Sequence, residues 1–166
     1  MAEATAPDPF AKDAFADIDR LYRSLMPFAE RVLGKYGYLV PAGATIDAEG
    51  RLNVVGAASG DLPVEEAVAG IYAGFREQAD ELRAVGVVTQ VQVPDGAGGD
   101  GVVDAIAVEL EHLYGKTLRI VVPYMHSRLL KRVRLGDSRV APGTVRVWVV
   151  PGGAGGPGAG AGDQPS

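Results

Sequence analysis

Residues 105–122 read AIAVELEHLYGKTLRIVV. Large aliphatic residues occupy every second position on both sides of the tripeptide LYG, and this period is typical of strands with one buried face. For both apolar faces to point the same way, the loop must have an odd length. We therefore expect residues 113–115 to form a turn that Gly115 closes in the left-handed conformation. The stretch predicts a β-hairpin in which Glu109 lies opposite Arg119 on an exposed face.

Similar alternation predicts the other strands of this sheet. They are residues 38–46 and 51–55, which form a hairpin around residues 47–50, then residues 87–93, and finally residues 129–135 and 145–150. The first of these has mostly small side chains, which suits an edge strand or a close backbone approach. The glycine-rich residues 94–101 lead into a strand and not into a helix N-terminus, so they predict a loop and not a phosphate site.

Two segments carry the three-to-four-residue period of amphipathic helices. The first spans residues 10–36, and Pro27 inside it predicts a kink or a restart near Met26. The second begins near Pro63 and ends around Gly86. The predicted fold class is α+β, with the two helices packed on one mainly antiparallel sheet of about five to seven strands. The elements follow the order α-β-β-α-β-β-β, with two further strands after them.

Length and composition indicate one domain over residues 10–150. Residues 1–9 and the Gly/Ala/Pro-rich residues 151–166 offer little to bury, so we expect both ends to be disordered. The chain has no cysteine, which excludes disulfides and thiolate metal sites. The N-terminus lacks the pattern of a signal peptide, and no apolar run approaches the roughly 18 residues of a membrane span. We therefore expect a cytoplasmic protein that does not enter a membrane.

Charge is distributed unevenly along the chain. Residues 1–115 hold 8 Lys or Arg against 19 Asp or Glu, a net charge of −11, whereas residues 116–166 hold 8 against 2, a net charge of +6. A basic C-terminal part on an acidic body indicates a complementary partner, which could be the protein's own acidic face, a second copy or a polyanion.

The strongest local signal is basic, and it gives a candidate interaction surface. Its members are Arg128, Lys131, Arg132, Arg134 and Arg139. On a strand Lys131 would share a face with Val133, while Arg132 would share the other face with Arg134. Such residues fit an acidic protein partner, a guarded edge strand or, as a weaker alternative, nucleic acid.

Four other residues form a candidate polar cluster: Glu111, His112, Tyr124 and His126. Glu111 and His112 are neighbours on a strand and so point to opposite faces. The spacing supplies no third zinc ligand, and no Ser-His-Asp set or cofactor motif is evident. The sequence thus predicts no catalytic, metal-binding or cofactor-binding residue, no cofactor and no enzymatic activity.

The Glu-His pair before Gly115, followed by Pro123-Tyr124 at the end of the next strand, resembles a pattern in small uncharacterised bacterial α/β proteins. The resemblance covers about residues 10–125. The element order is also similar to that of roadblock-like and profilin-like modules. These resemblances imply a binding or dimerisation scaffold in a bacterial protein, although topology by itself does not transfer function.

Three functions follow, in order. The first is a non-catalytic cytoplasmic protein-interaction module that self-associates, for example as a homodimer. The second is a small-ligand or regulatory domain with a pocket between the first helix and the sheet. That pocket would be lined by Tyr22, Tyr36, Tyr38 and Tyr72. The third is nucleic-acid binding through residues 128–139.

Overall fold

A computed structural model describes residues 9–56, 60–96 and 98–149 of the chain. The first part contains helix α1 (Pro9–Tyr36), strands β1 (Ala42–Asp47) and β2 (Leu52–Gly56), helix α2 (Val64–Glu77) and the short 3₁₀ helix η1 (Ala79–Glu81). The second part contains β3 (Leu82–Pro94), β4 (Val102–His112), β5 (Thr117–Ser127), β6 (Arg132–Leu135) and β7 (Arg139–Pro142). Among the described strands, the sheet order is β2-β1-β3-β4-β5-β6, β7 pairs with β5, and each pair is antiparallel. The predicted α+β fold class is confirmed.

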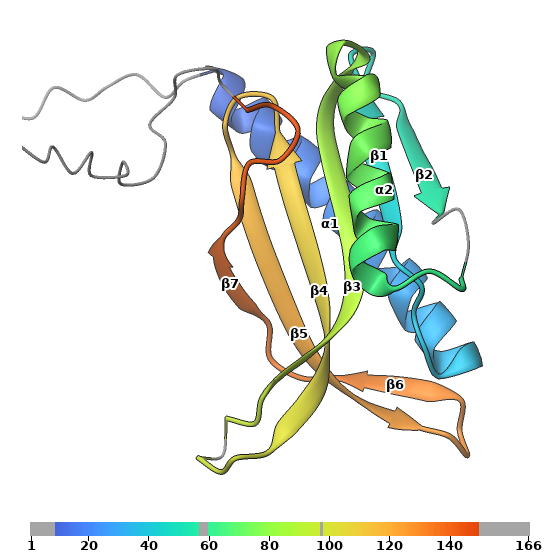
Figure 1. Cartoon of the computed structure of the whole chain (residues 1–166). Coiled ribbons are helices and arrows are strands. Elements are labelled where there is room, and N and C mark those ends of the chain that lie inside the picture. The colour runs from blue at the N-terminus through green and yellow to red at the C-terminus, as the bar shows by residue number, and fades with distance from the viewer. Residues whose placement is uncertain (1–8, 57–59, 97, 150–166) are drawn as a thin grey trace, which may run out of the picture.

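The two helices cover opposite faces of the sheet (Figure 1). α1 packs Leu21, Leu25 and Leu33, all fully buried, against aliphatic residues of β1, β3, β4 and β5. α2 packs Ile71 and Phe75 on the other face, where the segment around Val147 joins them. Burying one such side chain contributes about 1.5–3 kcal/mol. The α1 face holds the larger core, and both faces of the central strands are covered.

The central hairpin forms as the sequence predicts. Glu109 pairs with Arg119 and forms a salt bridge with it, and Gly115 closes the turn with φ of 81°. The face that carries the carboxylates is not exposed throughout, as predicted, because Glu111 is only 3% exposed. The reason is that the chain after β7 returns over this face.

Three predicted boundaries are wrong. α2 ends at Glu77 and not around Gly86, because η1 turns the chain and β3 begins at Leu82. α1 does not restart near Met26, since the helix continues through Pro27. Residues 145–149 form no strand; β7 lies earlier, at Arg139–Pro142.

The small side chains of β1 have a packing reason. β1 is not an edge strand, because β2 and β3 flank it. A Cβ atom on Gly43 would lie 2.7 Å from Cζ of Phe75 and 2.9 Å from Cγ2 of Ile71. Glycine is therefore required for α2 to approach the sheet this closely, and the predicted close approach is confirmed.

Of the segments expected to be disordered, residues 1–8 and 151–166 lie outside the described residues, and α1 already begins at Pro9. Within the described ranges, neither helix is long and apolar enough to cross a membrane.

Candidate functional site: a basic hairpin and two buried anchors

β5 and β6 form a hairpin that turns away from the main sheet (Figure 1). Its register runs from Tyr124 opposite Leu135 to Ser127 opposite Arg132, and residues 128–131 make the tip. Lys131 has φ of 49°, a left-handed conformation that closes this tip. We call residues 124–135 the basic hairpin. α1 supports it from behind, because a Cβ on Gly34 would lie 2.8 Å from the carbonyl oxygen of Lys131.

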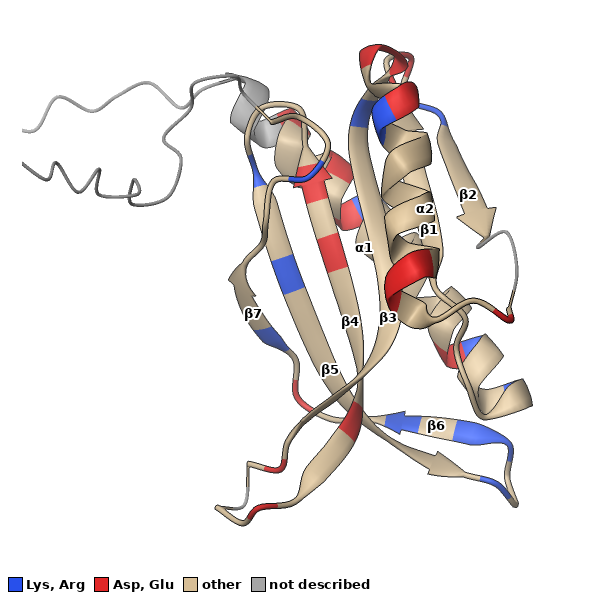
Figure 2. Ribbon diagram, viewed as in Figure 1, with Lys and Arg blue, Asp and Glu red and all other residues tan. Residues whose placement is uncertain are grey.

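Four of the five predicted surface cations belong to the basic hairpin, and all of them are exposed: Arg128, Lys131, Arg132 and Arg134. None forms a salt bridge with a carboxylate in the described part of the chain. Figure 2 shows this basic region on β6 and the tip, while the acidic side chains of α2 lie elsewhere. The predicted face-sharing of Lys131 with Val133 is wrong, because Lys131 lies in the turn and not on the strand.

The fifth predicted cation, Arg139, belongs to a different place. It lies on β7, and its guanidinium packs 3.0 Å from the position of a Cβ on Gly96. Arg134 and Arg139 both line a small hollow of about 280 Å³ beside Pro123. Arg139 is therefore adjacent to the basic hairpin and not part of its tip.

Exposed apolar residues accompany the charges. Leu129 is 93% exposed, Leu130 is 65% exposed and Met125 is 75% exposed. The two leucines lie at the tip between Arg128 and Lys131. Apolar side chains held in water beside arginines are characteristic of residues that contact a partner.

The structure does not bring the four residues of the predicted polar cluster together. Glu111 pairs with Thr117 at one end of β5, whereas Tyr124 and His126 pair with β6 at the other end. Glu111 and His112 point to opposite faces, as predicted, and each has its own partners. This arrangement excludes a shared site for the four.

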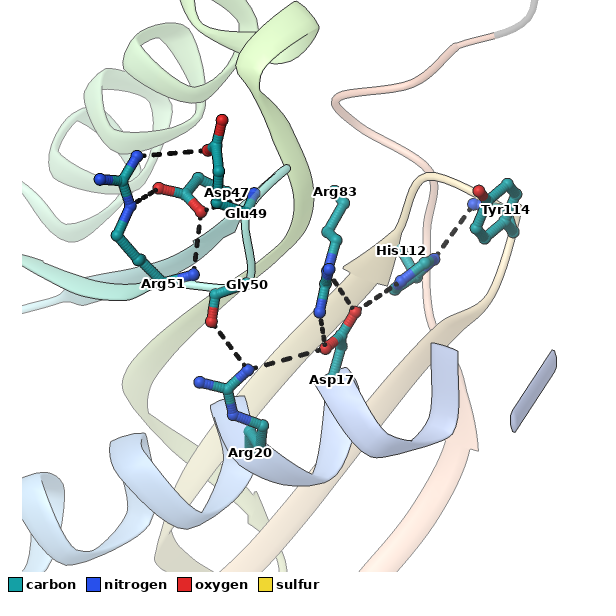
Figure 3. Close-up of polar contacts among 9 residues, drawn as sticks. All are labelled: Asp17, Arg20, Asp47, Glu49, Gly50, Arg51, Arg83, His112 and Tyr114. Carbon is teal, nitrogen blue, oxygen red and sulfur yellow. Dashed lines mark hydrogen bonds and ion pairs between the residues drawn. The ribbon is translucent and has the colours of Figure 1, made fainter. Parts of the chain in front are cut away.

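His112 belongs to a buried charged cluster with Asp17 and Arg83 (Figure 3). Arg83 donates from Nε to Oδ2 of Asp17 at 2.8 Å and from Nη2 to Oδ1 at 2.9 Å. His112 Nε2 lies 3.1 Å from the same carboxylate, and the backbone N–H of Tyr114 donates to His112 Nδ1 at 3.2 Å. Because Nδ1 accepts that bond, the ring carries its proton on Nε2 and donates it to Asp17.

The cluster joins α1 to β3 and β4, and its chemistry is structural. Burial would raise the pKa of Asp17, but hydrogen bonds and charge from Arg83 and His112 outweigh it and hold that pKa below its usual value. His112 is 1% exposed and both its ring nitrogens are engaged, so the pair offers no free nitrogen to a substrate.

Sequence reasoning missed Asp17 and Arg83, although one signal was present. Asp17 falls between Ala14 and Leu21 on the apolar stripe of α1, where a carboxylate must find a partner.

Glu111 holds the C-terminal segment on the opposite face. Its carboxylate accepts hydrogen bonds from the backbone N–H groups of Arg146, Val147 and Trp148 at 3.0–3.1 Å. The indole of Trp148 donates to the carbonyl of Ala79 at 3.3 Å. Glu111 is thus an anchor for residues 146–148, and not an acid or base beside Glu109.

The predicted tyrosine pocket does not form. Tyr72 lies on α2, across the sheet from α1, where it packs edge-on against Phe75 and where burial raises its pKa to about 12. Tyr36 and Tyr38 are exposed, with ring centroids 6.3 Å apart. Because the helices cover opposite faces of the sheet, no single pocket reaches all four tyrosines.

A different hollow of about 770 Å³ opens between the C-terminal end of α1 and β5. Its lining includes Lys35, Tyr36, His126, Arg128 and Lys131. In the described part of the chain, His126 Nε2 is a buried nitrogen without a hydrogen-bond partner. Within the same ranges, no three His, Asp or Glu side chains gather in a way that could hold a metal ion.

No family model, curated protein or solved structure matches this chain. The resemblance to small bacterial α/β proteins therefore stays a prediction.

Proposed function

We propose that this chain is a non-catalytic, cytoplasmic protein-interaction module that self-associates through the basic hairpin. The observation that carries the proposal is the combination of four cations without a carboxylate partner in the described residues and two leucines exposed between them. Moving apolar surface out of water contributes about 25 cal/mol per Å², so a partner that covers the tip gains from both leucines. The cations favour a partner whose surface is acidic.

The features of the basic hairpin favour protein over nucleic acid. A single-stranded nucleic acid requires exposed aromatic rings for stacking, whereas Tyr124, the aromatic residue of the hairpin, is 7% exposed. The acidic α2 would also repel a polyanion that extends beyond the hairpin.

Sedimentation of the full chain over a concentration series tests the proposal. We expect association at low salt that weakens as salt screens the charges. The double substitution Arg132→Glu with Arg134→Glu should leave a monomer. Arg23→Glu is the control, because Arg23 is an exposed cation on α1 that pairs with Asp19, and this variant should still associate. A wild-type chain that is monomeric at every concentration contradicts the proposal.

A second candidate is a small-ligand domain, favoured by the unpartnered His126 Nε2 beside the hollow of about 770 Å³. Lys35, Arg128 and Lys131 give the hollow a positive lining, which suits a small carboxylate or phosphate. Thermal unfolding in the presence of such anions tests this function. Stabilisation of the wild-type chain, lost in His126→Phe, would support it, and a panel without any stabiliser would count against it.

A further inference from the structure

A groove of about 420 Å³ runs between α2 and the β1–β2 edge of the sheet. Its apolar lining includes Val55, Leu62, Ile71 and Phe75. The α2 side is concave because Gly70 and Gly74 line it, and a Cβ added at either position would meet no atom within 4 Å. β2 borders the groove, has no neighbour on its outer side among the described strands, and exposes Val54 and Val55.

The surroundings of the groove are acidic. α2 and η1 carry five exposed carboxylates against the single cation Arg76: Glu65, Glu66, Glu77, Asp80 and Glu81. Within the described ranges none of the five is in a salt bridge, and Glu66 and Glu81 line the groove directly. The groove thus presents an apolar floor beside uncompensated negative charge.

We infer that this groove receives the tip of the basic hairpin from a second copy of the chain. The inference rests on the proposed function and names the acceptor surface for it. Leu129 and Leu130 supply apolar side chains for the floor, and Arg128 and Lys131 flank them, so each feature of the tip has a counterpart in the groove. The complementarity joins the two unpaired charge groups of the molecule.

The contact is between copies and not within one chain. β2 and β6 lie at opposite ends of the sheet order, so the hairpin of a chain is remote from its own groove (Figure 1). A hairpin-to-groove contact joins two different surfaces, and it either closes into a ring or continues as a chain of subunits. A ring of two copies, with both hairpins seated, would be the homodimer expected from the sequence.

Two variants test the inference from its two sides. Gly70→Leu with Gly74→Leu fills the groove, and it should raise the melting temperature because leucine favours a helix more than glycine does. Leu129→Asp with Leu130→Asp alters the exposed tip and should leave the melting temperature unchanged. The matched control is Ala69→Leu with Ala73→Leu, which has the same spacing on α2 at positions outside the groove lining.

We expect each of the two variants to be monomeric in sedimentation, with a dissociation constant raised roughly a hundredfold, and the control to associate like the wild type. A mixture of the two variants keeps one intact tip and one intact groove. It should therefore form a one-to-one complex.

The outcomes separate the two proposals. If the groove-filled variant still associates, or if the mixture stays monomeric, the hairpin-to-groove inference is wrong while self-association through the hairpin stands. If the wild-type chain does not associate, the proposed function itself fails.

Discussion

Replacing Asp17 with alanine should cost far more stability than the same replacement two residues later. Asp17 is 3% exposed and accepts from Arg83 and His112, whereas Asp19 is exposed and pairs only with Arg23, one turn along α1. Both aspartates lie on the same helix, so the comparison holds residue type and helix propensity constant.

The magnitude follows from what each substitution leaves behind. A hydrogen bond to a charged group contributes about 1.5–3 kcal/mol, and a buried donor without an acceptor costs about 1–3 kcal/mol. In Asp17→Ala the Nε2–H of His112 loses its acceptor in a buried site, while Arg83, whose side chain is 34% exposed, can partly turn to water. We therefore expect a loss of about 3 kcal/mol for Asp17→Ala and below about 0.5 kcal/mol for Asp19→Ala.

Urea unfolding followed by far-UV circular dichroism measures both free energies. The reasoning is refuted if the two variants differ by less than about 1 kcal/mol, which lies below the contribution of a single charged hydrogen bond. The pH dependence adds a second test. The pKa of Asp17 is lowered in the folded state, so its contribution is complete above the unfolded value near 4 and disappears as the pH falls through the folded value. The difference between wild type and Asp17→Ala should thus be constant at neutral pH and shrink below about pH 4.

Three further outcomes follow from contacts described above. Glu111→Gln places an amide against backbone N–H donors, so residues 146–148 should detach at a cost of about 1–3 kcal/mol, and the emission of Trp148, the single tryptophan, should shift to the red. Gly43→Ala should lower the free energy of unfolding by about 1–3 kcal/mol because α2 must move, whereas Gly56→Ala, with no atom within 4 Å, should stay within about 0.5 kcal/mol in the same denaturation assay. Gly115→Ala should cost about 1 kcal/mol in thermal unfolding, since alanine strains a φ of 81°; an unchanged midpoint would contradict the turn assignment.

The central hairpin could be predicted because its information is local. The alternation on both sides of residues 113–115 and the need for a left-handed glycine determine the register, and the pairing of Glu109 with Arg119 follows. The end of α2 could not be predicted in this way. Leu82 continues the apolar period of the helix, but it belongs to β3, and a short apolar run fits either structure.

The C-terminal segment shows a second reason for failure. Val145, Val147 and Val149 alternate like a strand, yet residues 146–148 direct their N–H groups to the carboxylate of Glu111 instead of to a neighbouring strand. An interaction between a side chain and a distant backbone leaves no periodicity in the sequence. The interaction surface was predicted at the level of its cations, but the turn at Lys131 and the exposure of Leu129 depend on tertiary structure.

The opposite orientations of Glu111 and His112 also bear on how the chain avoids misfolding. A shift of β4 by one residue would turn the carboxylate of Glu111 toward Asp17 and the imidazole toward the backbone N–H groups of residues 146–148. Two carboxylates would then face each other in a buried site, and three donors would lose their acceptor. This dipeptide therefore works as a check on alignment, because its two polar groups can both be satisfied in the native register and neither is satisfied when the strand slips by one.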